Sequence, residues 1–151
     1  MITDAGELDM AAYERLLSDG KVGLVSMTHM SNVLGTVTPL KEIVARAHAK
    51  GVPVLADGCQ GAVHEIVDVQ ALDVDFYAIT GHKLYGPTGI GVLWARREIL
   101  DQMPPFLGGG DMISSVTFEK STWARVPHKF EAGTPAILEG IGLKAAIDWV
   151  L

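Results

Sequence analysis

The sequence is poor in cysteine, in long apolar runs and in basic residues. Cys59 is the only cysteine among 151 residues, so no internal disulfide can form, and we expect a cytoplasmic protein. No apolar run approaches the ~18 residues of a membrane span, and the acidic N-terminus lacks the basic start of a secretory signal. The 12 Lys and Arg against 18 Asp and Glu give a net charge of −6, which argues against nucleic-acid binding.

Metal-ligand patterns are also missing, whereas glycine is plentiful. The histidines at positions 29, 48, 64 and 128 have no spacing typical of a zinc site, so we expect no metal. There are 17 glycines, several of them clustered between residues 81 and 110. With 48% hydrophobic residues, the chain has the composition of one ordinary globular domain.

Short apolar runs alternate with amphipathic segments along most of the chain. The pattern predicts strands over residues 22–27, 52–56, 74–79 and 90–94. It predicts helices over residues 8–17, 39–50, 68–72, 96–103 and 135–151, with an irregular stretch over 108–130. In the helix over 39–50 the expected apolar stripe is Leu40, Ile43, Val44 and Ala47, and Asp68 is expected to cap the short helix through residue 72. In the last helix we expect Ile137, Ile141, Leu143 and Trp149 to be buried. This alternation predicts an α/β fold with a mainly parallel sheet flanked by helices.

Polar residues follow three of the predicted strands, where open parallel sheets bind their ligands. They are Asn32 after the first strand, Asp57 and Gln60 after the second, and Thr80, His82 and Lys83 after the third. Each has an ordinary structural explanation, because strand-end carboxylates cap turns and most lysines extend over apolar surface.

Lys83 and Asp57 also allow a functional interpretation. Lys83 lies between Gly81 and Gly86, which permit close backbone approach, and a partly desolvated lysine can form a Schiff base. An inward Asp57 carboxylate needs a cationic partner or a protonated heteroaromatic nitrogen. A hydroxyl at Thr80 and an imidazole at His82 suit a phosphate or phenolate oxygen.

Several motifs together resemble a known family. They are Ala56-Asp-Gly-Cys-Gln60, Asp68-Val-Gln-Ala-Leu-Asp-Val-Asp-Phe-Tyr77, Thr80-Gly-His-Lys-Leu-Tyr-Gly-Pro-Thr-Gly-Ile-Gly-Val-Leu93 and the shorter segments 28–36, 104–113 and 130–135. In this order they resemble group II, SufS-type cysteine desulfurases, which are pyridoxal 5'-phosphate (PLP) enzymes of the class V aminotransferase superfamily. The resemblance covers nearly the whole chain and implies the large domain of PLP-dependent transferases of fold type I. It also implies that residues 1–151 are only part of that domain, without its N-terminal part and the C-terminal small domain.

The resemblance assigns a role to each matching residue. Lys83 is similar to the catalytic lysine that forms a Schiff base with PLP, and Asp57 to the carboxylate that pairs with the pyridine nitrogen. The cofactor-binding residues it implies are Asn32 near the substrate carboxylate, Gln60 at the phenolic oxygen, Thr80 and His82 at the phosphate, and Thr134, which in a homodimer reaches the neighbouring subunit's cofactor.

The implied reaction converts L-cysteine to L-alanine and passes sulfur, as a persulfide, to an acceptor protein for iron–sulfur cluster assembly. A selenocysteine lyase, or another class V enzyme acting on a related small substrate, is the alternative within the superfamily, and an inert folding or interaction module is the alternative outside it. Cys59 stands where the family has a small residue, so we expect a buried structural thiol. The resemblance places the family's catalytic cysteine in a C-terminal region without a counterpart here, so we expect no desulfurase activity from these 151 residues alone.

Overall fold

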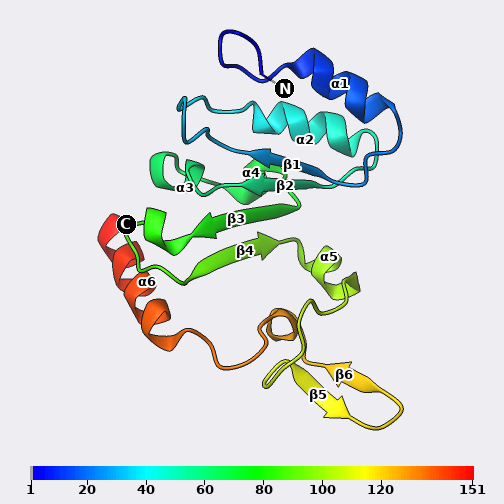
Figure 1. The fold of residues 1–151 in the computed structure, drawn as a ribbon, viewed down its shortest axis with the longest axis vertical. Helices are drawn as coiled ribbons and strands as arrows, with labels where there is room; N and C mark the ends of the chain where they lie inside the picture. The colour runs from blue at the N-terminus through cyan, green and yellow to red at the C-terminus, as the bar shows by residue number, and fades with distance from the viewer. Residues whose placement is uncertain (1) are drawn as a thin grey trace.

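The computed structural model describes residues 2–151 and is built on a four-stranded sheet (Figure 1). The strand order is β1-β2-β3-β4, with β1 (Val25–Thr28), β2 (Val54–Asp57) and β3 (Phe76–Thr80) parallel and β4 (Gly91–Ala95) antiparallel to β3. The α/β class and the mainly parallel sheet are therefore confirmed. Among residues 2–151, no helix combines the length and apolar character that crossing a membrane requires.

Two N-terminal helices cover the β1 and β2 side of the sheet. In α2 (Leu40–His48) the predicted apolar stripe of Leu40, Ile43, Val44 and Ala47 is fully buried, and this helix contacts β2. The core also takes in Tyr13 and Leu17 of α1 (Met10–Ser18). This apolar cluster fixes β1 and β2, and with them the polar residues at their ends.

Short helices connect the remaining strands. They are α3 (Gly61–His64) and α4 (Val69–Leu72) between β2 and β3, the 3₁₀ turn η1 (Gly81–Lys83) after β3, and α5 (Arg97–Gln102) after β4. Asp68 caps α4 as the sequence predicts, because its carboxylate accepts the backbone amides of Gln70 and Ala71. In contrast, α2 begins one residue later than predicted, at Leu40.

The C-terminal third differs most from the sequence prediction. Residues 108–130, expected to be irregular, contain the hairpin of β5 (Ile113–Val116) and β6 (Ser121–Trp123), which projects from the body of the molecule, and the 3₁₀ turn η2 (His128–Phe130) (Figure 1). The closing helix α6 (Ile137–Val150) is present. Of its four residues expected to be buried, only Leu143 is; Ile137, Ile141 and Trp149 are exposed, because α6 contacts the rest of the chain along a narrow side only.

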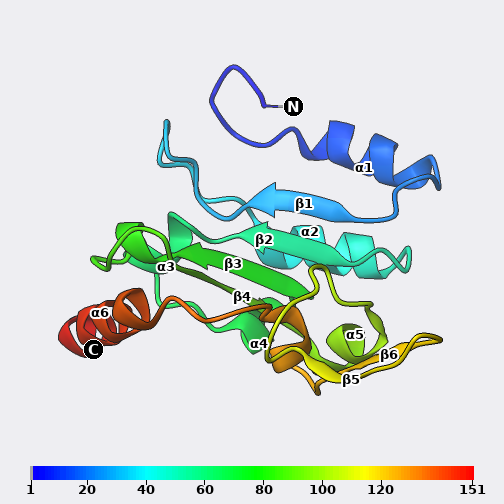
Figure 2. The same ribbon diagram turned by 60° about the horizontal axis from the view of Figure 1, so that its bottom comes forward.

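Parallel pairing brings the carboxyl ends of β1, β2 and β3 to one edge of the sheet (Figure 2). Thr28 is in register with Asp57, and Asp57 with Ala78. Because β4 runs in the opposite direction, its first residue, Gly91, pairs with Thr80 at this same edge. All the polar groups predicted from the strand ends therefore follow strands that finish side by side.

Candidate active site

Asp57 and Lys83 approach each other at this edge. Asp57 is the last residue of β2, and Lys83 ends the 3₁₀ turn that directly follows β3. The Cys59 backbone amide donates to Asp57 Oδ1 over 3.0 Å. That bond and the Cys59 thiol lower the pKa of Asp57 below its ordinary value; partial burial opposes them, and the Lys83 ammonium adds a smaller lowering. Asp57 is exposed rather than turned inward. The carboxylate is therefore ionised at neutral pH and close enough to interact with Lys83.

The half-buried Cys59 is a weak nucleophile in this setting. Burial raises the pKa of its thiol, and the hydrogen bond and negative charge of Asp57 raise it further, while Lys83 opposes them. Since the thiolate is the reactive form of cysteine, a raised pKa makes Cys59 less reactive at neutral pH. The expected structural role agrees with this environment, although the side chain is less buried than predicted.

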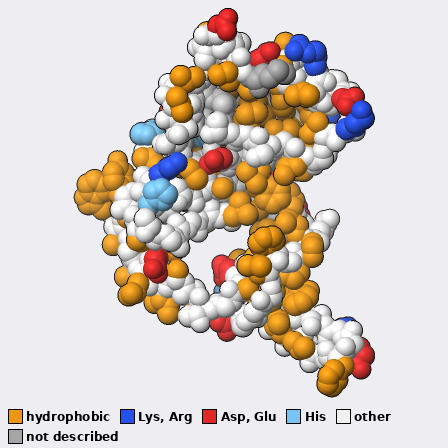
Figure 3. Space-filling view, viewed as in Figure 1, with side chains coloured by type: hydrophobic (Ala, Val, Ile, Leu, Met, Phe, Trp, Pro, Cys, Tyr) orange, Lys and Arg blue, Asp and Glu red, His pale blue; other side chains and the backbone are white. Residues whose placement is uncertain are grey.

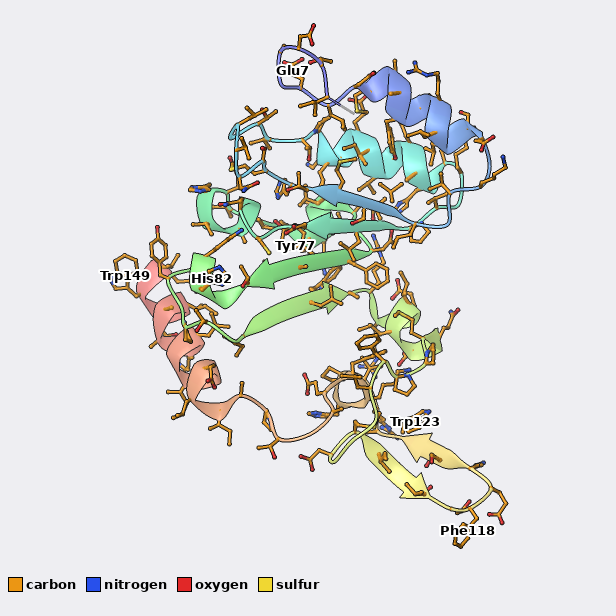
Figure 4. The ribbon with its side chains drawn as sticks, viewed as in Figure 1. Glu7, Tyr77, His82, Phe118, Trp123 and Trp149 are labelled. Atoms are coloured by element: carbon orange, nitrogen blue, oxygen red, sulfur yellow. The ribbon has the colours of Figure 1, made fainter. Side chains whose placement is uncertain are left out.

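Thr80 and His82 form a pair beside Lys83. The Thr80 hydroxyl and His82 Nδ1 are 3.0 Å apart, and His82 is exposed at the end of β3 (Figure 4). Over the carboxyl ends of β2 and β3, Figure 3 shows a basic, an acidic and a histidine side chain gathered together. This edge therefore offers a hydroxyl, an imidazole, an amine and a carboxylate within a short stretch of surface.

The loop after Lys83 folds tightly back onto the turn that carries it. The backbone amides of Leu84 and Gly86 both donate to the Gly81 carbonyl, over 3.0 and 2.9 Å. A Cβ atom on Gly86 would lie 2.9 Å from that carbonyl oxygen, which is too close for any other residue. Gly81 and Gly86 therefore allow the close backbone approach that the sequence predicts, and the resulting compact turn holds Lys83 at the strand end.

The remaining predicted site residues show fewer contacts. Gln60 is half-buried and precedes α3. Asn32 is exposed in a turn whose amides at Val33 and Leu34 donate to the Ser31 hydroxyl. Thr134 is exposed before α6. No hydrogen bond joins these three side chains to Asp57 or Lys83 in residues 2–151, so their roles stay predictions.

The sequence interpretation missed a buried pair beneath the site, His29 and Tyr77. Their Nδ1 and hydroxyl are 2.8 Å apart, and the rings meet edge to face. Burial lowers the pKa of His29 and raises that of Tyr77 to about 12, so both groups are neutral at pH 7. Only the closely spaced Gly58 and Gly61, which make room for the two rings, could have indicated them. Within the described residues, no group of three or more acidic, His or Cys side chains is arranged to hold a metal.

Comparison with known proteins decides the family. The family model for class-V aminotransferases matches residues 1–151. The chain therefore belongs to the class-V aminotransferase family. A relative from Dickeya dadantii, named cysteine desulfurase, is 57% identical over 150 residues, which is 99% of this chain and 36% of the relative.

Solved structures agree with this class-V assignment. The crystal structure of the cysteine desulfurase CsdA from Escherichia coli aligns with a TM-score of 0.86 and 47% identity, over 91% of this chain and 35% of CsdA. A mutant of C-DES, with glycine covalently linked to its PLP cofactor, aligns at 0.79 and 33% identity, over 91% of this chain and 38% of C-DES. The confirmed fold is therefore that of PLP-dependent fold type I enzymes. This class-V chain spans about a third of the length of these relatives.

Proposed function

We propose that this chain is the central part of the large domain of a PLP-dependent cysteine desulfurase, with Lys83 as the residue that binds the cofactor covalently. One observation carries the proposal: Asp57, whose carboxylate is ionised, ends β2, and Lys83 closes the turn directly after the adjacent parallel strand β3, so that both lie at the same end of the sheet. A carboxylate and an amine placed together in this way match the two ends of PLP, a basic ring nitrogen and an aldehyde.

The chemistry of the residues present fits PLP. Asp57 has a lowered pKa, so it remains an anion that can hold a proton on the pyridine nitrogen. The Thr80 hydroxyl and the His82 imidazole, 3.0 Å apart, can both bind a phosphate oxygen. The side-chain amide of Gln60 can donate to the phenolic oxygen, and Asn32 can bind the substrate carboxylate.

Each residue then has a defined task in the reaction. When bound, PLP supplies an electron sink for carbanion chemistry at the substrate α-carbon. Asp57 keeps the ring nitrogen protonated, which strengthens that sink. Lys83 would hold the cofactor through its Nζ, and as a free amine it would take and return the proton at the substrate α-carbon.

The name of the relatives favours L-cysteine as the substrate and an acceptor protein for the sulfur. The finer proposal is a SufS-type cytoplasmic enzyme that supplies iron–sulfur cluster assembly, as a homodimer in which Thr134 reaches the neighbouring cofactor. CsdA at 47% identity is equally compatible. The likeness to C-DES, called a cystine C–S lyase and solved with its product cysteine persulfide, makes a C–S lyase the second candidate. A selenocysteine lyase would use the same residues.

Cys59 takes no part in sulfur transfer under this proposal. Its raised pKa and its place in the turn next to Asp57 suit a structural thiol. The 151-residue chain is then expected to release sulfide or alanine from L-cysteine no faster than free PLP does. A clearly faster release, abolished by Cys59→Ala, would assign the nucleophile to Cys59 instead.

Titration with PLP tests the proposal directly. The wild-type chain should develop the visible absorbance of lysine-bound PLP, and borohydride should make that attachment irreversible. Lys83→Ala should remove the absorbance, whereas Lys144→Ala, on the exposed face of α6, should retain it. A chain that is folded by circular dichroism and yet shows no absorbance would favour the inert module.

A further inference from the structure

A hydrogen-bonded pair of buried rings lies directly under the candidate cofactor site. His29 directly follows β1, and Tyr77 is the second residue of β3; they are 7% and 3% exposed. Figure 4 shows Tyr77 inside the sheet, away from the surface where His82 lies. Both groups are neutral, so one of them donates and the other accepts in the 2.8 Å hydrogen bond between His29 Nδ1 and the Tyr77 hydroxyl.

The turn of residues 57–61 rests on these two rings. A Cβ atom on Gly58 would lie 2.0 Å from Tyr77 Cε1, and one on Gly61 would lie 2.4 Å from His29 Nδ1. Real Cβ atoms do not approach so closely, so the turn sits against the rings with no space between them. The position of the two rings therefore sets the distance between this turn and the sheet.

That same turn carries the groups that would bind the cofactor. Its backbone is tied on both sides, since the His29 amide donates to the Asp57 carbonyl and the Gly58 amide donates to the Ala78 carbonyl, each over 2.8 Å. Asp57 begins the turn and Gln60 lies within it. A shift of either ring would therefore move the carboxylate relative to Lys83.

We propose that His29 and Tyr77 are positioning residues, which hold the turn of residues 57–61 in the orientation that cofactor binding requires. This inference rests on the proposed function. Neither side chain needs to touch the cofactor, because the pair acts through the backbone of the turn. Misplacement of the Asp57 carboxylate weakens its pairing with a ring nitrogen, since charge-assisted hydrogen bonds depend on geometry.

A second buried tyrosine provides a matched control. The Tyr13 hydroxyl, also buried, donates to the Ile43 carbonyl over 2.8 Å in the packing of α1 on α2. Tyr13→Phe and Tyr77→Phe each remove one buried hydroxyl and one hydrogen bond, so their stabilities should fall by similar amounts. Only Tyr77→Phe lies under the turn.

Cys59 provides a readout that does not depend on PLP. It is the only cysteine, and its backbone amide is bonded to Asp57 within the turn. We expect Tyr77→Phe to raise the rate of Cys59 alkylation several-fold and to weaken PLP binding about tenfold, with Tyr13→Phe near wild type in both. His29→Asn, which keeps a polar atom near the Nδ1 position, should be closer to wild type than His29→Leu.

Two outcomes separate this inference from the proposed function. Equal alkylation rates and equal PLP affinities in Tyr77→Phe and Tyr13→Phe would overturn the positioning role, even if wild type binds PLP at Lys83. If wild type binds no PLP, the proposed function fails, while the alkylation rates still decide whether the pair holds the turn. A rate raised in Tyr77→Phe alone supports that part of the inference.

Discussion

The lowered pKa of Asp57 comes from Cys59 in its own turn and from Lys83 after the next strand. The Cys59 amide and thiol stabilise the carboxylate more than Lys83 does, so the anion is prepared before any ligand arrives. Lys83 is held by a turn whose backbone closes on the Gly81 carbonyl. Both residues were predictable as strand-end groups from the sequence, since Asp57 directly follows an apolar run and Lys83 lies between glycines.

The His29–Tyr77 pair could not be predicted in the same way. Its members are 48 residues apart, and each stands next to apolar positions where a polar partner is not visible in sequence. Their contact depends on the β1-β2-β3 order, because His29 follows β1 and Tyr77 lies two strands away. Tertiary pairing of this kind emerges only when the sheet is assembled.

Gly58→Ala should destabilise the fold by about 2 kcal/mol, a typical cost of overpacking. The added Cβ would lie 2.0 Å from the Tyr77 ring, so the ring or the turn has to move. Urea unfolding followed by circular dichroism measures the change. Gly140→Ala, in α6 with nothing near its Cβ, is the control and should stabilise by about 0.5 kcal/mol; a Gly58→Ala chain as stable as wild type would contradict the close packing.

His29 should make stability fall as the pH is lowered. Burial lowers the pKa of His29 in the folded chain, with the Glu65 charge opposing it and Tyr77 neutral beside it. The unfolded chain therefore binds a proton more readily, and the contribution of neutral His29 is complete above its unfolded pKa of about 6.5 and lost below it. Unfolding free energies measured from pH 7.5 to 5 should decline less steeply for His29→Asn than for wild type. Parallel slopes would show that His29 does not titrate with a lowered pKa.

The strands place their functional and structural polar groups at opposite ends. At the end remote from Lys83, Asp75 is buried; its Oδ2 accepts the Val54 amide over 2.7 Å and lies 2.8 Å from His48 Nε2. Arg96 Nε lies 3.2 Å from Asp75 Oδ1 as an ion pair, without the geometry of a hydrogen bond. This cluster joins α2, β2, β3 and the end of β4.

Replacing Asp75 by alanine should cost about 2 kcal/mol, because it leaves the buried Val54 amide without its acceptor, although the exposed Asp73 still pairs with His48 and Arg96. It should leave PLP binding nearly unchanged, since the cluster is remote from Lys83. Asp148→Ala, which removes the exposed pair with Lys144 on α6, should cost less than about 0.5 kcal/mol. Equal losses in the two variants, measured by thermal unfolding, would argue against a structural role for the Asp75 cluster.

How well each helix could be predicted depended on what it packs against. The stripe of α2 was correct in every residue, because that helix has one apolar face and buries it on the sheet. In α6 apolar residues surround the helix, so the sequence could not indicate that Leu143 and Ala146 are the buried ones. The β5–β6 hairpin was missed because its strands are short and fully or mostly exposed, which leaves little alternation to detect.

Taken as a whole, the molecule exposes much apolar surface around a small core. Figure 3 shows orange side chains over α6 and an opening through the molecule between β4 and the segment leading to α6. Leu138 and Trp149 are 80% and 75% exposed, and Trp149 packs edge to face on Tyr85 at 5.3 Å. Contiguous apolar surface of this kind marks an interaction site.

We therefore expect the chain to self-associate. Its weight-average mass in sedimentation equilibrium should rise with concentration, and Leu138→Lys with Ile141→Lys should shift it toward the monomer, because both side chains are exposed on α6. Leu107→Lys is the control, because Leu107 is also an exposed leucine and lies in the segment between α5 and β5, away from α6 (Figure 1). A wild-type chain that stays monomeric at every concentration would contradict this expectation.

The central claim is that this fold presents Lys83 to PLP. It is tested most directly by reducing the PLP-loaded chain with borohydride and locating the attached cofactor by peptide mass spectrometry. Among the seven lysines, we predict a single stoichiometric adduct on Lys83, strongly diminished by Asp57→Ala. Label spread over several lysines, or the same yield on Lys83 after Asp57→Ala, would contradict the account.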